Sequence, residues 1–564
     1  MIEQLQDRQG RRTLIFGIDG GTWEVLDRMI ASGLMPCLAY LKESGAWGNL
    51  QSVVPVNSAA AWSTILTGQA PEWHGVFDFL TWRTEKNSGS PHSELCRATV
   101  NASFLPHPTI LDLLGEAGPV LSLRVPMTYP PQKVNGVVVA GLPTPDDESA
   151  FTNPLGLANE LNPLIERGSS CRSWQLHDHS RDNILDQLEA GLRSLERMSD
   201  HLLSNVEFQT CFVVARDVDE LQHFFWDVLF PPTDQDEKQV GFVERYLGRI
   251  ERYFFRLDRY LEKMLDWAGT NARVVIFSDH GFGSLEQVWH VNEWLQQRGF
   301  LKPWPDYASS QGEHSLDWKI RLNFALQRRF LKVLKRLGFS GANLESSLSR
   351  LKQSSQRDAD LGGIDWNATV AYAGNVGEEW LPIYINRQNR EPQGIVSDQQ
   401  YEEVRSDLFG ALLSDPELKI KAVYRKEDLF DSAAPFFHQA PDVIVETESG
   451  SMQTDFRIGG RQVLEKAMYR KACHRRRGMF LLSGQDVKPG HSEASLADIP
   501  ATILNWMELP LPDYFSGRPL LEHLPQANAE VATQSPQLSS PDCQVLSSAE
   551  ESQVRQKLES LGYL

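Results

Sequence analysis

The chain has 564 residues, of which 41% are hydrophobic and 23% are charged, a balance typical of a globular enzyme. This length exceeds one simple domain and favours a large α/β core with insertions. The formal net charge of −19 argues against general nucleic-acid binding, which needs a basic surface. The six cysteines form no CxxC pair, so the sequence indicates neither a zinc ribbon nor a dithiol redox motif.

The sequence contains no candidate transmembrane segment. No run approaches the roughly 18 apolar residues of a membrane span. Residues 1–12 are polar and charged and lack the apolar stretch of a secretory signal. We therefore expect a cytoplasmic protein, and the sequence does not indicate its oligomeric state.

The predicted elements begin with a buried strand over residues 13–18, which ends at Asp19. A helical stretch follows through about residue 42, and a second helix is expected over 59–66. That helix opens after Asn57 and Ser58 and closes at a glycine, as capping chemistry prefers. Further strands are predicted over 120–123, 136–140, 212–214, 274–277, 383–385, 442–445 and 479–482. Further helices are predicted over 184–205, 239–268, 398–413, 495–507 and 548–561.

This alternation of strands and helices predicts an α/β fold with a mostly parallel central sheet covered by helices on both faces. We expect a core formed by residues 12–302 and 361–524, interrupted by a basic, amphipathic helical cap insertion over 303–360. Residues 525–564 are expected to form a linker and a C-terminal tail. The insertion is either a cap over the site or a surface that touches an anionic membrane.

Two Asp/His pairs follow predicted strands at the point where each strand ends. Asp219 and His223 lie four residues apart, which places both on one face of a helical turn. Asp279 and His280 are adjacent and are followed by a flexible glycine. Functional groups of an open α/β sheet gather at the carboxyl ends of its strands. Two such pairs on neighbouring strands can hold two metal ions, which indicates phosphoryl chemistry.

Three further positions complete the candidate site. Asp19 stands directly after the first strand. Ser58 opens a helix, whose first N–H groups and dipole can hold a phosphate and favour an alkoxide. The last histidine is either His474 or His491, and residue chemistry does not decide between them. Oxygen and nitrogen donors without thiolates suit zinc, with manganese or iron as alternatives.

Together these residues resemble the alkaline phosphatase superfamily. The likeness is greatest to its type I phosphodiesterase/nucleotide pyrophosphatase branch and to the related bacterial phosphohydrolase/phosphomutase-like proteins. Several short sequence blocks in a fixed order carry this resemblance, and their combination makes it specific, whereas any one block alone would be weak evidence. The blocks that carry the resemblance are 16–20, 54–75, Asp219-x3-His223, Ser278-Asp279-His280-Gly281-Phe282, 474–484 and 497–504.

The resemblance implies two metal sites and a covalent mechanism. Ser58 would attack phosphorus and form a phospho-enzyme intermediate that water then hydrolyses. The order of the family's motifs favours His474 over His491, because His474 leads into a strand. The implied ligands of the two divalent ions are Asp19, Ser58, Asp279 and His280 for one and Asp219, His223 and His474 for the other.

The sequence departs from the family's pattern in two places. Ser58 stands where the pyrophosphatase branch typically has threonine, and no asparagine follows the pair His74-Gly75. Ser58 also lacks the C/S-x-P-x-R context of a sulfatase. We therefore expect a metal-dependent phosphodiesterase or phosphatase acting on a small-molecule or lipid-like phosphoester. The alternatives are a phosphomutase or phosphotransferase using the same site, and a non-catalytic member of the superfamily.

Overall fold

The computed structural model describes residues 11–525 and 546–561, apart from a set of internal gaps. The predicted cap insertion from residue 305 onward and the linker over 526–545 lie outside the described residues. The gaps are 86–93, 107, 146–150, 167–180, 233–236, 305–360, 362, 392, 449, 459–461 and 469.

The central sheet confirms the predicted fold class. Within the described part of the chain it has nine strands, and only β19 and β7 run antiparallel to their neighbours. The inner strands are apolar and completely buried, as expected for a parallel sheet covered on both faces. Their order is β20 (Gly490–Ser495), β2 (Ala46–Gln51), β19 (Arg477–Ser483), β9 (Arg273–Phe277), β1 (Thr13–Ile18), β8 (Thr210–Ala215), β5 (Val120–Leu123), β6 (Gly136–Val139) and β7 (Thr152–Asn153).

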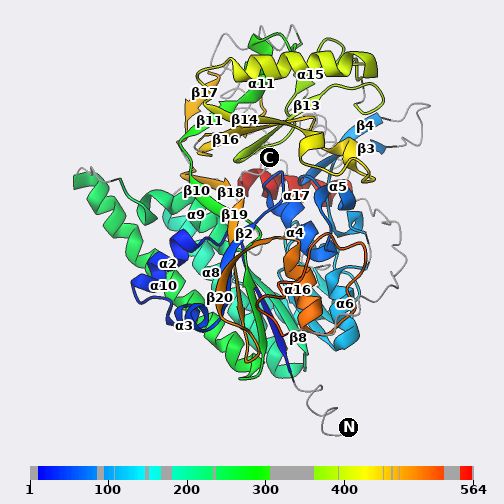
Figure 1. Cartoon of the computed structure of the whole chain (residues 1–564). Coiled ribbons are helices and arrows are strands. Elements are labelled where there is room, and N and C mark those ends of the chain that lie inside the picture. The colour runs from blue at the N-terminus through cyan, green and yellow to red at the C-terminus, as the bar shows by residue number, and fades with distance from the viewer. Residues whose placement is uncertain are drawn as a thin grey trace, which may run out of the picture.

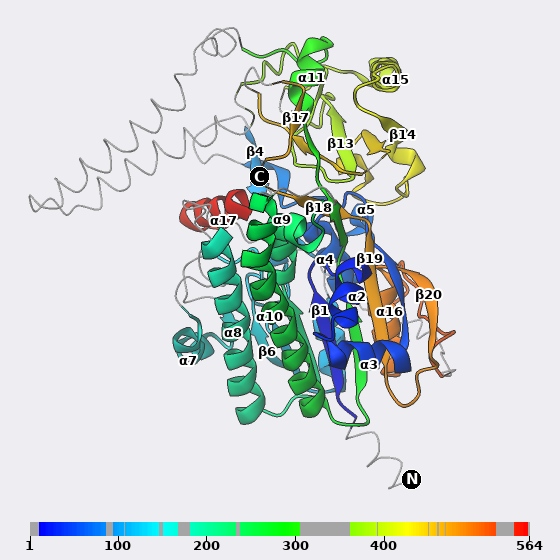
Figure 2. The same cartoon turned by 90° about the vertical axis from the view of Figure 1, so that its left-hand side faces the viewer.

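Helices cover both faces of this sheet (Figure 1). The long helices α8 and α10 lie side by side across one face, with α3 beside them (Figure 2). The opposite face is covered by α4, α6 and α16, which pack on one another. The helices of this lobe are α2 (Trp23–Ala31), α3 (Pro36–Ser44), α4 (Ser58–Thr67), α5 (Pro71–His74), α6 (Ile110–Ala117), α7 (Ala158–Leu161), α8 (Arg181–Asn205), α9 (Asp217–Leu229), α10 (Glu237–Ala268) and α16 (Asp498–Trp506).

A smaller lobe lies above the carboxyl ends of the central strands (Figure 1). The chain enters it after β10 (Gly281–Ser284) and returns through β18 (Ala472–Arg475), and these two strands pair antiparallel. The lobe has its own buried apolar cluster, which includes Trp289, Leu381 and Leu408. Its elements are β11 (Gln287–His290), α11 (Val291–Gln297), β12 (Ala371–Tyr372), β13 (Trp380–Ile385), α15 (Asp398–Leu413), β14 (Ile420–Arg425), β15 (Val443–Thr447), β16 (Met452–Asp455) and β17 (Leu464–Lys466).

The structure agrees with the predicted elements more closely at apolar strands than at polar ones. The strands predicted over 383–385 and 442–445 exist, but they pair antiparallel in the smaller lobe. The strands β2 and β20 were not predicted, because in both of them more buried residues alternate with more exposed ones. Among the described residues, no helix is long and apolar enough to cross a membrane. The domain limits drawn from the sequence stand as a proposal.

The C-terminal helix predicted over 548–561 is present as α17 (Ser548–Leu561). It packs against β4 (Glu94–Thr99), which forms a hairpin with β3 (Leu80–Glu85). Val554 and Leu558 of α17 are completely buried against the large lobe. The turns of α17 that carry Val554 and Leu558 are therefore part of the folded core.

Truncation of a buried α17 side chain should destabilise the whole protein. We expect Leu558→Ala to lower the free energy of unfolding by about 2–5 kcal/mol, because it leaves a cavity in a completely buried site. Urea unfolding followed by circular dichroism measures this change. The exposed neighbour Gln556→Ala is the control, and an equal, small effect of both changes would contradict the packing of α17.

Candidate metal centre

The register of the parallel strands brings the predicted site residues together. Ile18 of β1 is level with Ala215 of β8, and Gly17 is level with Phe277 of β9. Asp19, the start of α9 and the segment after β9 therefore meet at one edge of the sheet.

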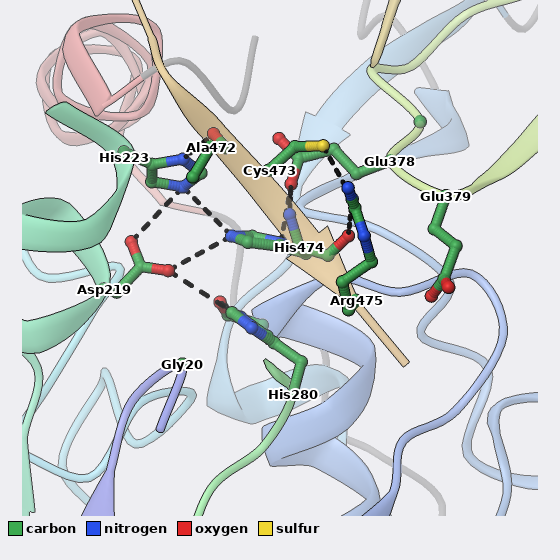
Figure 3. Close-up of polar contacts among 12 residues, drawn as sticks. Gly20, Asp219, His223, His280, Glu378, Glu379, Ala472, Cys473, His474 and Arg475 are labelled. Atoms are coloured by element: carbon green, nitrogen blue, oxygen red, sulfur yellow. Dashed lines mark hydrogen bonds and ion pairs between the residues drawn. The ribbon is translucent and has the colours of Figure 1, made fainter. Parts of the chain in front are cut away.

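The first group of side chains is formed by Asp219, His223 and His474 (Figure 3). His474 Nε2 lies 3.1 Å from Asp219 Oδ1 and 3.1 Å from His223 Nε2. His223 Nε2 lies 3.6 Å from Asp219 Oδ2. Two residues come from α9 and the third from β18, so the strand that leads back from the smaller lobe completes the group.

The second group surrounds His280. Its Nε2 lies 3.2 Å from Ser58 Oγ, 3.3 Å from Asp279 Oδ2 and 3.8 Å from both Asp19 Oδ1 and Asp219 Oδ1. Asp219 thus borders both groups (Figure 3). None of the seven side chains is more than 2% exposed.

Ser58 is the first residue of α4, and Asn57 is its N-cap. The Asn57 Oδ1 accepts a hydrogen bond from the Ala60 N–H at 2.9 Å. The capping role expected for the start of this helix therefore belongs to Asn57. The Ser58 hydroxyl faces the His280 imidazole and stands at the positive end of the helix dipole.

The acceptors around each imidazole indicate which of its nitrogens carries the proton. His223 Nδ1 faces the Ala472 carbonyl at 2.9 Å, and His280 Nδ1 faces the Gly281 carbonyl at 3.2 Å. His474 Nδ1 lies 3.1 Å from a carboxylate oxygen of Glu378. These acceptors favour N–H at Nδ1, so each Nε2 directs a lone pair into the centre.

The carboxylates of the centre repel one another. Burial, and then Asp279 and Asp219, raise the pKa of Asp19 well above its usual value. Burial, with a smaller contribution from Asp219, raises the pKa of Asp279 to about 7, although the Gly20 N–H opposes this rise. Burial opposes ionisation of Asp219, but His223, His474 and His280 hold its pKa below the usual range. Asp19 Oδ1 and Asp279 Oδ2 have no hydrogen-bond donor among the described residues.

These features fit divalent cations. Burial keeps the pKa of His223 and of His280 well below the usual value, so both imidazoles are neutral, as metal ligands must be. Within the described part of the chain, some of these buried carboxylate oxygens lack a hydrogen-bond donor, and imidazole lone pairs point toward the same space. This arrangement is destabilising unless positive charge lies between the groups. The oxygen and nitrogen donors suit zinc, manganese or iron.

The two histidines between which the sequence left a choice lie far apart in the fold. His474 belongs to the centre, whereas His491 is exposed on β20 and packs edge-on against Trp47 at the sheet edge. All seven residues expected as ligands from the sequence lie in the cluster, and their roles as ligands stay a proposal.

Sequence reasoning missed Glu378. This residue comes from the smaller lobe, and its carboxylate accepts a hydrogen bond from the His474 backbone N–H as well as facing His474 Nδ1. Arg470 lies 3.0 Å from the same carboxylate. Glu378 therefore orients the imidazole in the manner of an outer-shell carboxylate in metal sites. No local pattern could reveal it, because it lies 96 residues from His474.

The segment after His74-Gly75 is also buried. Phe79 is completely buried, and its N–H donates to Asp78 Oδ1 at 2.5 Å. Burial raises the pKa of Asp78 to about 7, opposed in part by its backbone hydrogen bond and by Arg97. The segment that lacks the asparagine of the family pattern thus contains a buried carboxyl group of high pKa.

A buried set of carboxylates and imidazoles at the carboxyl edge of a mostly parallel sheet is typical of metal-dependent hydrolases. A model of the family described as type I phosphodiesterase/nucleotide pyrophosphatase matches residues 13–457. The chain belongs to this family, within the alkaline phosphatase superfamily, and is a metal-dependent phosphoric-ester hydrolase. His474 lies beyond the matched range, and the other six residues lie within it.

Solved structures similar to this chain include two kinds of enzyme. Phosphonoacetate hydrolase from Sinorhizobium meliloti 1021 in complex with phosphonoformate is 15% identical, with a TM-score of 0.46, over 84% of this chain and 89% of that chain. Murine ectonucleotide pyrophosphatase/phosphodiesterase 5 is 12% identical, with a TM-score of 0.45, over 89% of this chain and 96% of that chain. No curated protein sequence matches the chain.

Removal of the Glu378 charge should weaken metal binding. We expect Glu378→Gln to lower zinc affinity by roughly 10- to 100-fold, because His474 loses its orienting carboxylate. A competition titration with a zinc chelator measures this affinity. Glu379→Gln is the matched control, since Glu379 bonds to the Arg476 backbone N–H instead. Equal zinc affinities of the two variants would exclude the orienting role of Glu378.

The high pKa of Asp78 should make stability fall as pH rises. Between about pH 4 and 7 the folded protein keeps the Asp78 proton, whereas the unfolded chain releases it. The free energy of unfolding therefore falls as the pH rises through this window. We expect Asp78→Asn to be more stable than wild type at pH 8, by up to roughly 4 kcal/mol, and similar to it at pH 4. Thermal unfolding at both pH values tests this, with exposed Asp407→Asn as control. A difference that does not change with pH would refute it.

Proposed function

We propose that this protein is a phosphodiesterase that uses two divalent metal ions, with zinc preferred and manganese or iron as alternatives, and Ser58 as nucleophile. The observation that supports this proposal is the convergence of three carboxylates and three imidazole lone pairs beside the Ser58 hydroxyl. A folded protein does not ordinarily bury three carboxylates and three imidazoles together without a cation between them.

The proposed ligands divide into two sets around Asp219. Asp219, His223 and His474 would hold one ion. Asp19, Asp279, His280 and the Ser58 oxygen would hold the other, with Asp219 close enough to border it. The Gly20 N–H donates to Asp279 Oδ1 at 3.1 Å and so orients that carboxylate. Cations held here supply positive charge that stabilises the phosphate and favours the Ser58 alkoxide.

The proposed hydrolysis proceeds in two steps. The Ser58 hydroxyl gives up its proton to solvent as its oxygen forms a bond to phosphorus, and the bond from phosphorus to one alcohol oxygen breaks, releasing that alcohol with a proton from solvent. Water then attacks the phosphoserine, which releases the phosphate monoester and restores the Ser58 hydroxyl. The Asn57 side chain accepts from the Ala60 N–H in the first turn of α4, and the positive end of the helix dipole favours the negative charge of the phosphate.

Removal of the Ser58 hydroxyl should abolish catalysis. We expect Ser58→Ala to lower the kcat for bis-p-nitrophenyl phosphate by about 10³-fold or more, and Ser58→Thr to retain part of it, because threonine supplies a hydroxyl. Rates are measured on chelator-treated protein before and after zinc is added. Ser63→Ala is the matched control on the same helix, since its hydroxyl donates to the Ala59 carbonyl.

The outcomes separate the parts of the proposal. Zinc-dependent activity that is lost in Ser58→Ala and accompanied by phosphate on Ser58 in acid-quenched samples would support both the nucleophile and the metal requirement. Full activity of Ser58→Ala would eliminate the nucleophile. Faster turnover of p-nitrophenyl phosphate than of the diester would eliminate the diester preference.

A further inference from the structure

Gln222 is a completely buried glutamine of α9 that has no part in the hydrolysis steps described above. It stands directly before His223 and three residues after Asp219. Its amide nitrogen Nε2 donates to the Gly20 carbonyl at 2.8 Å and to the Val218 carbonyl at 3.3 Å. The two protons of the amide therefore have acceptors, one within α9 and one in the turn that follows β1.

Gly20 connects two carboxylates of the group around His280. It follows Asp19 directly in the chain, and its N–H donates to Asp279 Oδ1 at 3.1 Å. The other oxygen of this carboxylate, Oδ2, then faces the centre and lies 3.3 Å from His280 Nε2. A shift of the Gly20 peptide would therefore displace Asp19 and Asp279 together.

Close packing confines the Gly20 turn. The Gly20 φ angle of 67° lies in the left-handed region, which glycine adopts without strain. A Cβ atom at this position would overlap the Phe282 ring and lie 3.3 Å from Gln222 Nε2. Phe282 also packs edge-on against His223 and His474, with ring centroids 4.7 Å and 5.2 Å apart. The turn is thus held between Gln222 and an aromatic ring that contacts the imidazoles of the centre.

Few side chains can replace glutamine in this position. The donor must reach from α9 to the Gly20 carbonyl without adding charge beside three buried carboxylates. A glutamate would direct a fourth carboxylate at two carbonyl oxygens, and a methionine of similar length has no donor. The neutral amide of Gln222 meets both requirements.

The Gln222 amide contributes little to the stability of the fold itself. Its Oε1 is buried and has no hydrogen-bond donor among the described residues. Replacement by methionine would remove this unsatisfied oxygen, but it would take the side-chain donor away from the buried Gly20 carbonyl. One unsatisfied acceptor would thus replace another, at a similar cost. What the amide contributes is therefore the position of Gly20.

We propose that Gln222 is a positioning residue for the second metal site, the one formed by Asp19, Asp279, His280 and Ser58. Its backbone belongs to α9, which carries two ligands of the first site. Its amide holds the turn through which two carboxylates of the second site are oriented. The inference rests on the proposed function, in which two ions occupy the centre, and adds the residue that sets one site relative to the other.

Zinc titration of proteins with one intact site tests the proposal. His474→Ala removes a ligand of the first site, and Asp279→Asn removes a ligand of the second. We expect Gln222→Met to lower zinc affinity by roughly 10- to 100-fold in the His474→Ala background, because the remaining site loses its support. In the Asp279→Asn background it should change zinc affinity by less than about threefold. Competition with a zinc chelator measures both affinities.

The controls separate a positioning role from a general effect on folding. Gln69→Met is the matched control, since Gln69 is also a buried glutamine and follows α4. Thermal unfolding of metal-free Gln222→Met should resemble that of metal-free Gln69→Met. Gln222→Leu, which also lacks the donor, gives the same comparison if the methionine variant does not fold. An equal loss of zinc affinity in both backgrounds, or no loss in either, would overturn the role of Gln222.

Zinc stoichiometry distinguishes failure of this inference from failure of the proposed function. If wild type binds fewer than two zinc ions, the two-metal proposal fails and this inference fails with it. If wild type binds two and Gln222→Met binds both as tightly, only the role of Gln222 is overturned. Excess zinc should restore hydrolysis of bis-p-nitrophenyl phosphate by Gln222→Met, because the second site is weakened and its ligands remain. A low kcat that persists at saturating zinc would contradict the positioning role.

Discussion

The repulsion among three buried carboxylates is the constraint on which the rest of this structure depends. Asp19, Asp219 and Asp279 meet at the carboxyl edge of the central sheet because β1, β8 and β9 are parallel and in register. Burial removes water from them, so each charge must be met by protons, imidazoles or cations. The imidazoles that surround them direct lone pairs toward the same space. The local chemistry therefore favours metal binding over a simple salt-bridge network.

The centre also explains why the two lobes belong together. The chain leaves the large lobe directly after His280 and returns directly before His474, through the paired strands β10 and β18. The smaller lobe contributes Glu378, which holds the His474 imidazole from the side opposite the centre. The position of one imidazole thus depends on packing in the smaller lobe, which links the metal centre to the lobe interface.

The contact between the two lobes also depends on distant parts of the chain. Arg97 of β4 donates to the Gly374 carbonyl and the Asn375 side chain of the smaller lobe. The C-terminal helix α17 supports this arginine, since Arg555 donates to the Arg97 carbonyl. Contacts therefore run from the C-terminal helix through the β3–β4 hairpin to the smaller lobe.

The sequence by itself determined the elements with strong local patterns, namely the buried strands 13–18 and 120–123, the helix 398–413 and the strand-end positions of Asp19, Asp219 and Asp279. Local periodicity and capping encode such features within a few residues. Only the tertiary structure decided that His474 rather than His491 joins the cluster, that Glu378 orients it, and that the strands near 383 and 443 form a separate antiparallel sheet. These contacts join residues far apart in the chain, and packing of whole elements, which no local pattern records, brings them together.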